Sequence, residues 1–131
     1  MQKIIKLFFF LFLPSTGLAS FIIDNNTKEY VTFYVTSTAL CPAKENNYVP
    51  PQTPNFELTQ TQMLHYCHLN NPCYIYLYAT NTIDNAKICN GEFVGILQWD
   101  LKKEIIQDLY TANSKYSITG ENTNKLTWNL Y

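Results

Sequence analysis

Two stretches of this sequence alternate between core-type and surface-type residues with a period of two, and this pattern constrains the fold more than any other feature. Successive side chains of a β-strand point to opposite faces. In residues 73–80 (CYIYLYAT), one face would hold Cys73, Ile75, Leu77 and Ala79. The other face would hold Tyr74, Tyr76, Tyr78 and Thr80. Residues 30–37 (YVTFYVTS) repeat the pattern, so both stretches are predicted to be strands with one buried face.

Turn-forming segments between apolar runs predict that the strands are arranged as hairpins. The three expected hairpins pair residues 21–23 with 30–37, 73–80 with 87–97, and 115–120 with 125–131. In the second hairpin, Gly91 and Gly95 mark positions for β-bulges. In the third, the inward side chains are expected to be Leu126, Trp128 and Leu130.

The segment between the first two hairpins is less regular. Residues 38–55 contain four prolines and several asparagines, which predicts a long loop because proline cannot join a central ladder. Residues 56–66 fit either a strand or a short helical turn. The helical alternative would begin near Thr59, with Gln62 three residues later as in a capping box.

Residues 100–112 change to a helical period. The apolar stripe comprises Leu101, Ile105, Ile106, Leu109, Tyr110 and Ala112, and charged or amide side chains fill the opposite face. Asp100 is a suitable N-cap residue. The pattern predicts an amphipathic helix between the second and third hairpins.

Six or seven short strands with turns about every ten residues favour a mainly β fold. The predicted architecture is a two-sheet antiparallel β-sandwich with one inserted amphipathic helix. The alternative is an α+β fold, in which a single antiparallel sheet packs on that helix.

The N-terminus has the three-part plan of a secretory signal peptide. Lys3 and Lys6 precede the apolar run 7–13, and Gly17 and Ala19 supply the small residues required before a cleavage site. The apolar run is about half the roughly 20 residues that span a bilayer. We therefore expect residues 1–19 to be a signal peptide, residues 20–131 to form a single domain, and the mature protein to be secreted or periplasmic, with no transmembrane segment.

The mature chain contains four cysteines, Cys41, Cys67, Cys73 and Cys89. An even number of cysteines in a small secreted domain predicts two disulfides, for which three connectivities exist. We favour Cys41–Cys67 with Cys73–Cys89, because both bonds then close loops of moderate length.

A metal site is the alternative use of the same region, where His65, Cys67, His68 and Cys73 lie within nine residues. Zinc requires thiolates at a spacing that lets the ligands converge as a tetrahedron. This spacing matches no familiar zinc motif, and pairing would consume the sulfurs in an oxidising compartment. We therefore expect neither a metal nor another cofactor.

The net charge and the absence of known motifs exclude several classes of function. The mature chain carries seven lysines, ten acidic residues and no arginine, a net charge of −3. Arginine is the usual bidentate partner of phosphates and guanine edges, so nucleic acid is not the expected partner. No motif for an activated nucleophile, a phosphate loop or a zinc protease occurs. A catalytic role would have to use His65 or His68 with an acidic partner, as in a small secreted hydrolase.

The tyrosines supply the leading functional hypothesis. Tyr74, Tyr76 and Tyr78 share the face opposite the core, and Tyr30 and Tyr34 have the same sense in the other strand. Tyrosine is enriched at recognition surfaces because it combines a rigid ring with a hydroxyl group. These residues predict a non-catalytic binding module for a glycan or for a host or envelope protein. The alternative is that they reflect β-propensity alone, or that the helix covers them.

The overall layout resembles a known group of proteins. A short signal precedes an NNT-containing first turn (25–27), a Cys-Pro loop at Cys41 and two further cysteine-bearing strands. This order is similar to small two-disulfide secreted proteins of Legionella-type intracellular bacteria, some of which are type II secretion substrates. The resemblance implies a bacterial, virulence-associated protein that is exported beyond the periplasm and acts on a host.

Overall fold

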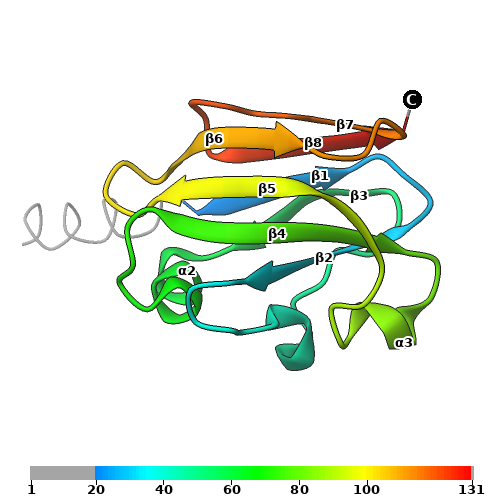
Figure 1. The fold of residues 1–131 in the computed structure, drawn as a ribbon, viewed down its shortest axis with the longest axis horizontal. Helices are drawn as coiled ribbons and strands as arrows, with labels where there is room; N and C mark the ends of the chain where they lie inside the picture. The colour runs from blue at the N-terminus through cyan, green and yellow to red at the C-terminus, as the bar shows by residue number, and fades with distance from the viewer. Residues whose placement is uncertain (1–19, 131) are drawn as a thin grey trace, which may run out of the picture.

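Two four-stranded sheets pack face to face in the computed structural model, which describes residues 20–130 (Figure 1). The mainly β, two-sheet architecture is therefore confirmed, whereas the expected signal peptide lies outside the described residues. The first sheet has the order β3-β1-β8-β7 and the second has the order β2-β4-β5-β6. The strands are β1 (Phe21–Asn25), β2 (Tyr30–Val35), β3 (Thr53–Leu58), β4 (Cys73–Thr80), β5 (Glu92–Asp100), β6 (Ile105–Thr111), β7 (Tyr116–Thr119) and β8 (Lys125–Leu130).

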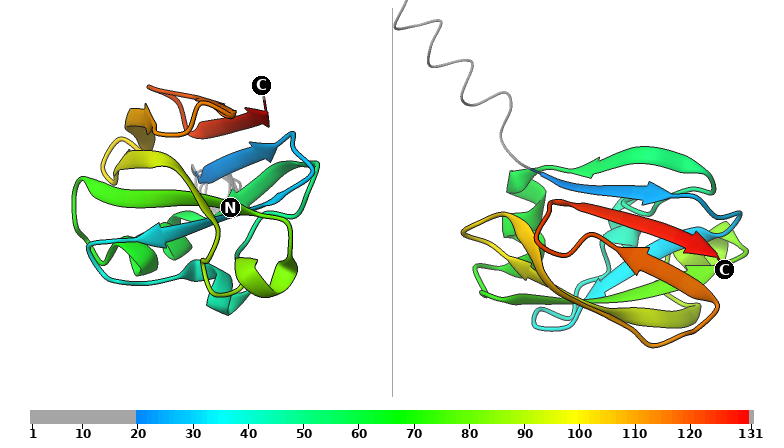
Figure 2. Two further views of the ribbon diagram at one scale, coloured as in Figure 1. Left: turned by 45° about the vertical axis from the view of Figure 1, so that its right-hand side comes forward. Right: turned by 90° about the horizontal axis from the view of Figure 1, so that it is seen from above.

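Large apolar side chains from both sheets fill the space between them. Figure 2 shows the arrangement of the strands from two further sides. The Phe21 ring of the first sheet lies 5.0 Å from the Trp99 ring and 6.4 Å from the Phe33 ring of the second. The inward residues predicted for residues 73–80 are all buried, and so are Leu126 and Trp128. Leu130 is the exception, because its side chain is half exposed.

The opening hairpin was predicted wrongly, because β1 and β2 belong to different sheets. β1 instead lies between β3, to which it is antiparallel, and β8, to which it is parallel. The fully buried Asn25 directs the crossing between the sheets. Its amide group donates to the carbonyl oxygens of Glu29 and Pro50, and its oxygen accepts from the backbone and hydroxyl of Thr27. The other two expected hairpins, β4–β5 and β7–β8, are confirmed.

The helix predicted for residues 100–112 does not form, because these residues are the end of β5, a turn and β6. Asp100 caps a turn, accepting from the backbone N–H groups of Lys102 (2.8 Å) and Lys103 (3.0 Å), and β6 follows. The register against β5 shifts at Gln107, so that one residue is unpaired. Two core-side residues, Ile106 and Leu109, are therefore three positions apart. This spacing gives a strand with a bulge the same apolar pattern as a helix.

Helical structure occurs elsewhere in the described chain. Helix α2 (Gln60–Cys67) begins after Thr59, and the capping box with Gln62 is present. A one-turn 3-10 helix, η1 (Pro42–Glu45), and a short α3 (Ile83–Ala86) lie within the loops. Between residues 20 and 130, no helix has the length and apolar character needed to span a membrane.

All four cysteines form disulfides, but not in the pairing we favoured. Cys41 bonds to Cys89 and Cys67 bonds to Cys73. Cys67 ends α2, and His68 and Leu69 both adopt left-handed backbone angles. This sharp reversal brings Cys73 back to a Cα–Cα distance of 5.6 Å from Cys67. Sequence spacing does not reveal such a turn, which is why the pairing was wrong.

Candidate functional site

The predicted tyrosine surface is the outer face of the second sheet. Strand register aligns one residue from each strand across this face. The row consists of Tyr34 (β2), Tyr76 (β4), Ile96 (β5) and Tyr110 (β6). Because alternate residues share a face, Tyr74 and Tyr78 flank Tyr76 on the same side as this row.

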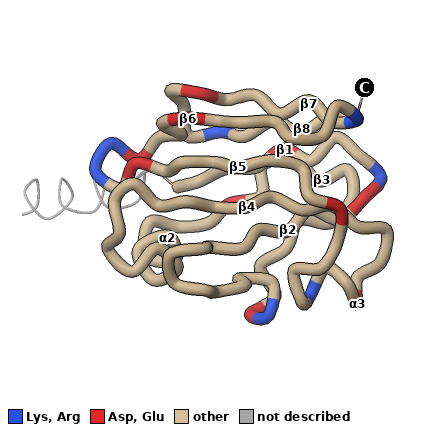
Figure 3. Tube along the Cα trace, in the orientation of Figure 1, with Lys and Arg blue, Asp and Glu red and all other residues tan. Residues whose placement is uncertain are grey.

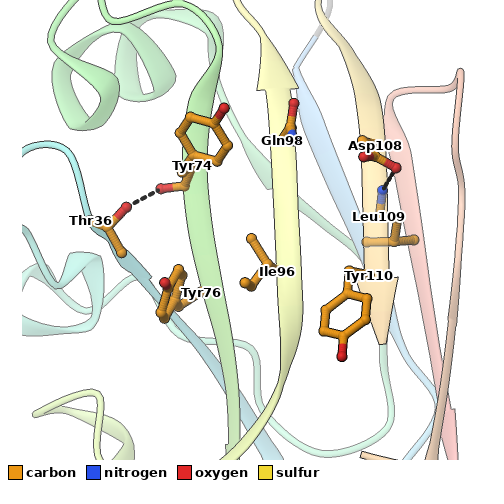
Figure 4. A pocket seen from close by; sticks show the side chains of 8 residues that line it. All are labelled: Thr36, Tyr74, Tyr76, Ile96, Gln98, Asp108, Leu109 and Tyr110. Atoms are coloured by element: carbon orange, nitrogen blue, oxygen red, sulfur yellow. Dashed lines mark hydrogen bonds between the residues drawn. The ribbon is translucent and has the colours of Figure 1, made fainter. Parts of the chain in front are cut away.

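A groove of about 330 Å³ is recessed in this face (Figure 4). The groove residues are Thr36, Tyr74, Tyr76, Ile96, Gln98, Asp108, Leu109 and Tyr110. Tyrosines from β4 form one wall, and residues of β6, with the Tyr110 ring, form the other. Ile96 and Gln98 of β5 lie between these walls and form the floor. Side chains of β4 and β6 thus stand on either side of the β5 side chains, and the groove lies between them.

The groove tyrosines remain accessible. Tyr74 is 41% exposed and Tyr110 is 61% exposed, whereas Tyr76 is half-buried. Phe93 braces the β4 wall, because its ring centroid lies 5.4 Å from that of Tyr76 and 5.7 Å from that of Tyr78. The walls are therefore packed aromatic side chains with solvent-facing edges, and this arrangement reduces the rotamer entropy lost when a ligand binds.

The structure distributes the five sequence-predicted tyrosines unequally. Tyr74 and Tyr76 line the groove, while Tyr34 and Tyr78 lie beside it. Burial raises the pKa of Tyr78, and the neighbouring hydroxyls of Tyr76 and Tyr34 raise it further. Tyr30 lies outside the groove lining, and its ring packs 6.0 Å from that of Tyr48.

The β6 wall was missed by the sequence analysis. Asp108 and Tyr110 had been assigned to opposite sides of a helix, but in a strand these two residues share a face. The available signal was the alternation at residues 108–110, in which Leu109 packs on the core and lies between Asp108 and Tyr110, two residues with polar groups.

The groove has an acidic character. The charged residues of the four strands in this sheet are Glu92, Asp100 and Asp108, all of which are acidic. Glu92 and Asp100 lie at the two ends of β5, and Asp108 lies on the edge strand β6. Figure 3 shows how few charged residues the strands of this sheet carry. Asp108 lines the groove opposite Gln98 in the strand register. Its Oδ1 accepts from the backbone N–H of Leu109 at 2.9 Å, which orients the carboxylate.

The histidines occupy a different part of the molecule. The Nε2 atom of His65 lies 3.6 Å from a carboxylate oxygen of Glu45, and both side chains are more than half exposed. The Tyr66 hydroxyl donates to Glu45 at 3.1 Å and receives a hydrogen bond from Asn47, so this cluster fastens α2 to η1. His68 is the C-cap residue of α2. Neither histidine lines the groove.

In the cysteine–histidine cluster of residues 65–73, the two cysteines form a disulfide bond. Cys67 and Cys73 are bonded to each other, so their sulfurs are not thiolates in this structure. Within residues 20–130, no three His, Cys, Asp or Glu side chains are grouped so that they could hold a metal ion.

Comparisons with known proteins identify the fold. No protein-family model matches the sequence, and no curated protein is similar enough to count as a match. Among solved structures, the chain is similar to the Legionella pneumophila type II secretion system substrate NttC. The TM-score is 0.67 at 17% sequence identity, over 88% of this chain and 100% of that chain. The resemblance noted in the sequence layout thus extends to the three-dimensional fold that this chain shares with NttC.

Proposed function

We propose that this protein is a secreted, non-catalytic binding module that recognises a glycan through the groove on its second sheet. The observation that carries the proposal is the groove itself, in which Tyr74, Tyr76 and Tyr110 surround a floor of Ile96 and Gln98. The apolar faces of sugar rings stack on aromatic side chains, while hydroxyl groups need nearby amide and carboxylate partners. Gln98, Asp108 and Thr36 supply such partners within the same groove.

Secretion is the second part of the proposal. The signal-like segment 1–19 and two disulfides fit an oxidising compartment. The fold likeness to a type II secretion substrate supports export beyond the periplasm. Fractionation of cultures with and without a working type II pathway tests this part. The protein should accumulate in the periplasm when that pathway is blocked.

A glycan array tests the binding function directly. Wild-type protein should bind a subset of glycans, and Tyr74→Ala with Tyr110→Ala should abolish that binding while the protein stays folded. Tyr30→Ala is the matched control, because it removes a tyrosine of the same sheet that lies outside the groove.

Two outcomes would oppose this proposal. Capture of a protein partner by the same groove, with no glycan bound, would replace the glycan with a host or envelope protein. Turnover of a bound glycan that is lost in His65→Ala would assign the protein to the hydrolases, with Glu45 as the acidic partner of His65.

A further inference from the structure

The charge of the groove restricts the glycans that it can accept. Asp108 is the one charged residue of the groove lining, and the strands that carry the groove contribute no lysine. An anionic sugar would meet a carboxylate with no cation among the lining residues to offset it. A neutral sugar would meet no such repulsion, and a cationic sugar would gain an opposite charge.

The position of Asp108 suits a cation that is attached to a sugar ring. The carboxylate lies on the β6 wall together with Tyr110, and Tyr74 and Tyr76 lie across the floor from it (Figure 4). The exposed Asp108 carboxylate accepts one hydrogen bond, from the Leu109 backbone N–H, and its other oxygen is left for a ligand. A sugar ring lying over Ile96 would therefore have tyrosine rings and a carboxylate within the same groove.

We infer that the groove prefers a glycan whose sugar units carry free amines over the same glycan with those amines acetylated. This inference rests on the glycan-binding function proposed above. The protonated amine would form a charge-assisted hydrogen bond with Asp108, and the tyrosine faces favour a cation through the negative potential of their rings. Acetylation removes the charge and leaves the sugar ring itself unchanged.

The amine preference is tested with two ligands that differ only in acetylation. The probes are glucosamine oligomers and N-acetylglucosamine oligomers of equal length, titrated calorimetrically at a pH where the free amines are protonated. We expect wild-type protein to bind the glucosamine oligomer about three- to tenfold more tightly. This advantage should shrink as salt is added, because the pair is exposed to solvent.

Substitutions assign the preference to one side chain. Asp108→Asn should remove the advantage of the free amine, so that the glucosamine and N-acetylglucosamine oligomers bind with equal affinity. Glu121→Gln is the matched control, because it removes one exposed negative charge in the turn between β7 and β8, away from the groove lining. The control should keep the wild-type preference.

The outcomes separate this inference from the proposed function. Equal affinity for the two oligomers, with both bindings weakened in Tyr110→Ala, would overturn the amine preference and support the glycan-binding groove. Binding of anionic glycans in preference to both oligomers would also overturn the inference. Absence of binding to these oligomers and to every glycan of an array would overturn the proposed function as well.

Discussion

The hydroxyl group of Tyr116 donates a 2.6 Å hydrogen bond to the carboxylate of Glu29, joining β7 of the first sheet to the segment that enters the second. The same hydroxyl lies 3.2 Å from a carboxylate oxygen of Glu92 at the start of β5, and Lys115 pairs with that carboxylate at 2.7 Å. The Tyr116 ring is buried and packs edge-on to Trp128. This cluster fastens the two sheets together at one end of the sandwich.

Removal of the Tyr116 hydroxyl should weaken the fold. In Tyr116→Phe the ring still packs, but the Glu29 carboxylate loses its donor, which costs about 1–3 kcal/mol. Urea unfolding of wild type and variant measures the difference. Tyr110→Phe is the control, because its side chain is exposed in the groove. An unchanged free energy of unfolding in Tyr116→Phe would show that the cluster contributes nothing.

The Tyr116 hydroxyl should also make the free energy of unfolding depend on pH in the alkaline range. Burial raises the pKa of Tyr116 above its ordinary value, and the hydrogen bond to Glu29 raises it further. A pKa that is higher in the folded than in the unfolded state stabilises the fold fully below about pH 10 and progressively less above it. The free energy of unfolding should therefore fall more steeply above that pH in wild type than in Tyr116→Phe. Parallel curves would contradict this account.

Asp24 should make the first sheet sensitive to acid. The backbone N–H of Asn55 donates to its carboxylate at 2.7 Å and Lys125 lies at 3.0 Å, and these contacts hold the pKa of Asp24 below its usual value. A lowered folded-state pKa stabilises the fold above about pH 4, and this contribution is lost as the pH falls further. Asp24→Asn should be less stable than wild type at neutral pH and equally stable in strong acid. A constant difference across pH would assign the loss to something other than ionisation.

The two disulfides should contribute unequally to stability. Cys41–Cys89 closes a loop with a sequence separation of 48, whereas Cys67–Cys73 spans a separation of 6. In the chain-entropy description, these loops are worth about 4 and about 2 kcal/mol respectively. Paired Cys→Ala substitutions, compared by denaturant unfolding, measure both values. The reverse order of losses would point to native-state contacts as the main contribution.

The strands were predictable wherever alternation was strict and one face was buried. Residues 73–80 show both properties, and their buried face was identified residue by residue. The segment from Ile105 to Thr111 was not, because the bulge at Gln107 shifts the alternation by one residue. The error extended to function, since it concealed that Asp108 and Tyr110 form a wall of the groove.

Strand and disulfide partners that are distant in the sequence could not be predicted from local residue patterns. The partners of β1 lie about 30 and about 100 residues later in the chain, and the choice between them and β2 depends on the buried Asn25 network. The disulfide pairing likewise depends on the backbone reversal at His68 and Leu69, two non-glycine residues with left-handed angles. Neither composition nor periodicity predicts such turns.

The most direct test of the groove is calorimetric titration of one glycan that the wild-type protein binds. We expect Tyr110→Ala to weaken that binding by about two- to tenfold, since stacking on one aromatic ring contributes about 0.5–1.5 kcal/mol. Tyr30→Ala should bind as wild type does, and both variants should unfold at similar denaturant concentrations. Equal binding by wild type and a folded Tyr110→Ala would contradict the claim that this groove is the binding site.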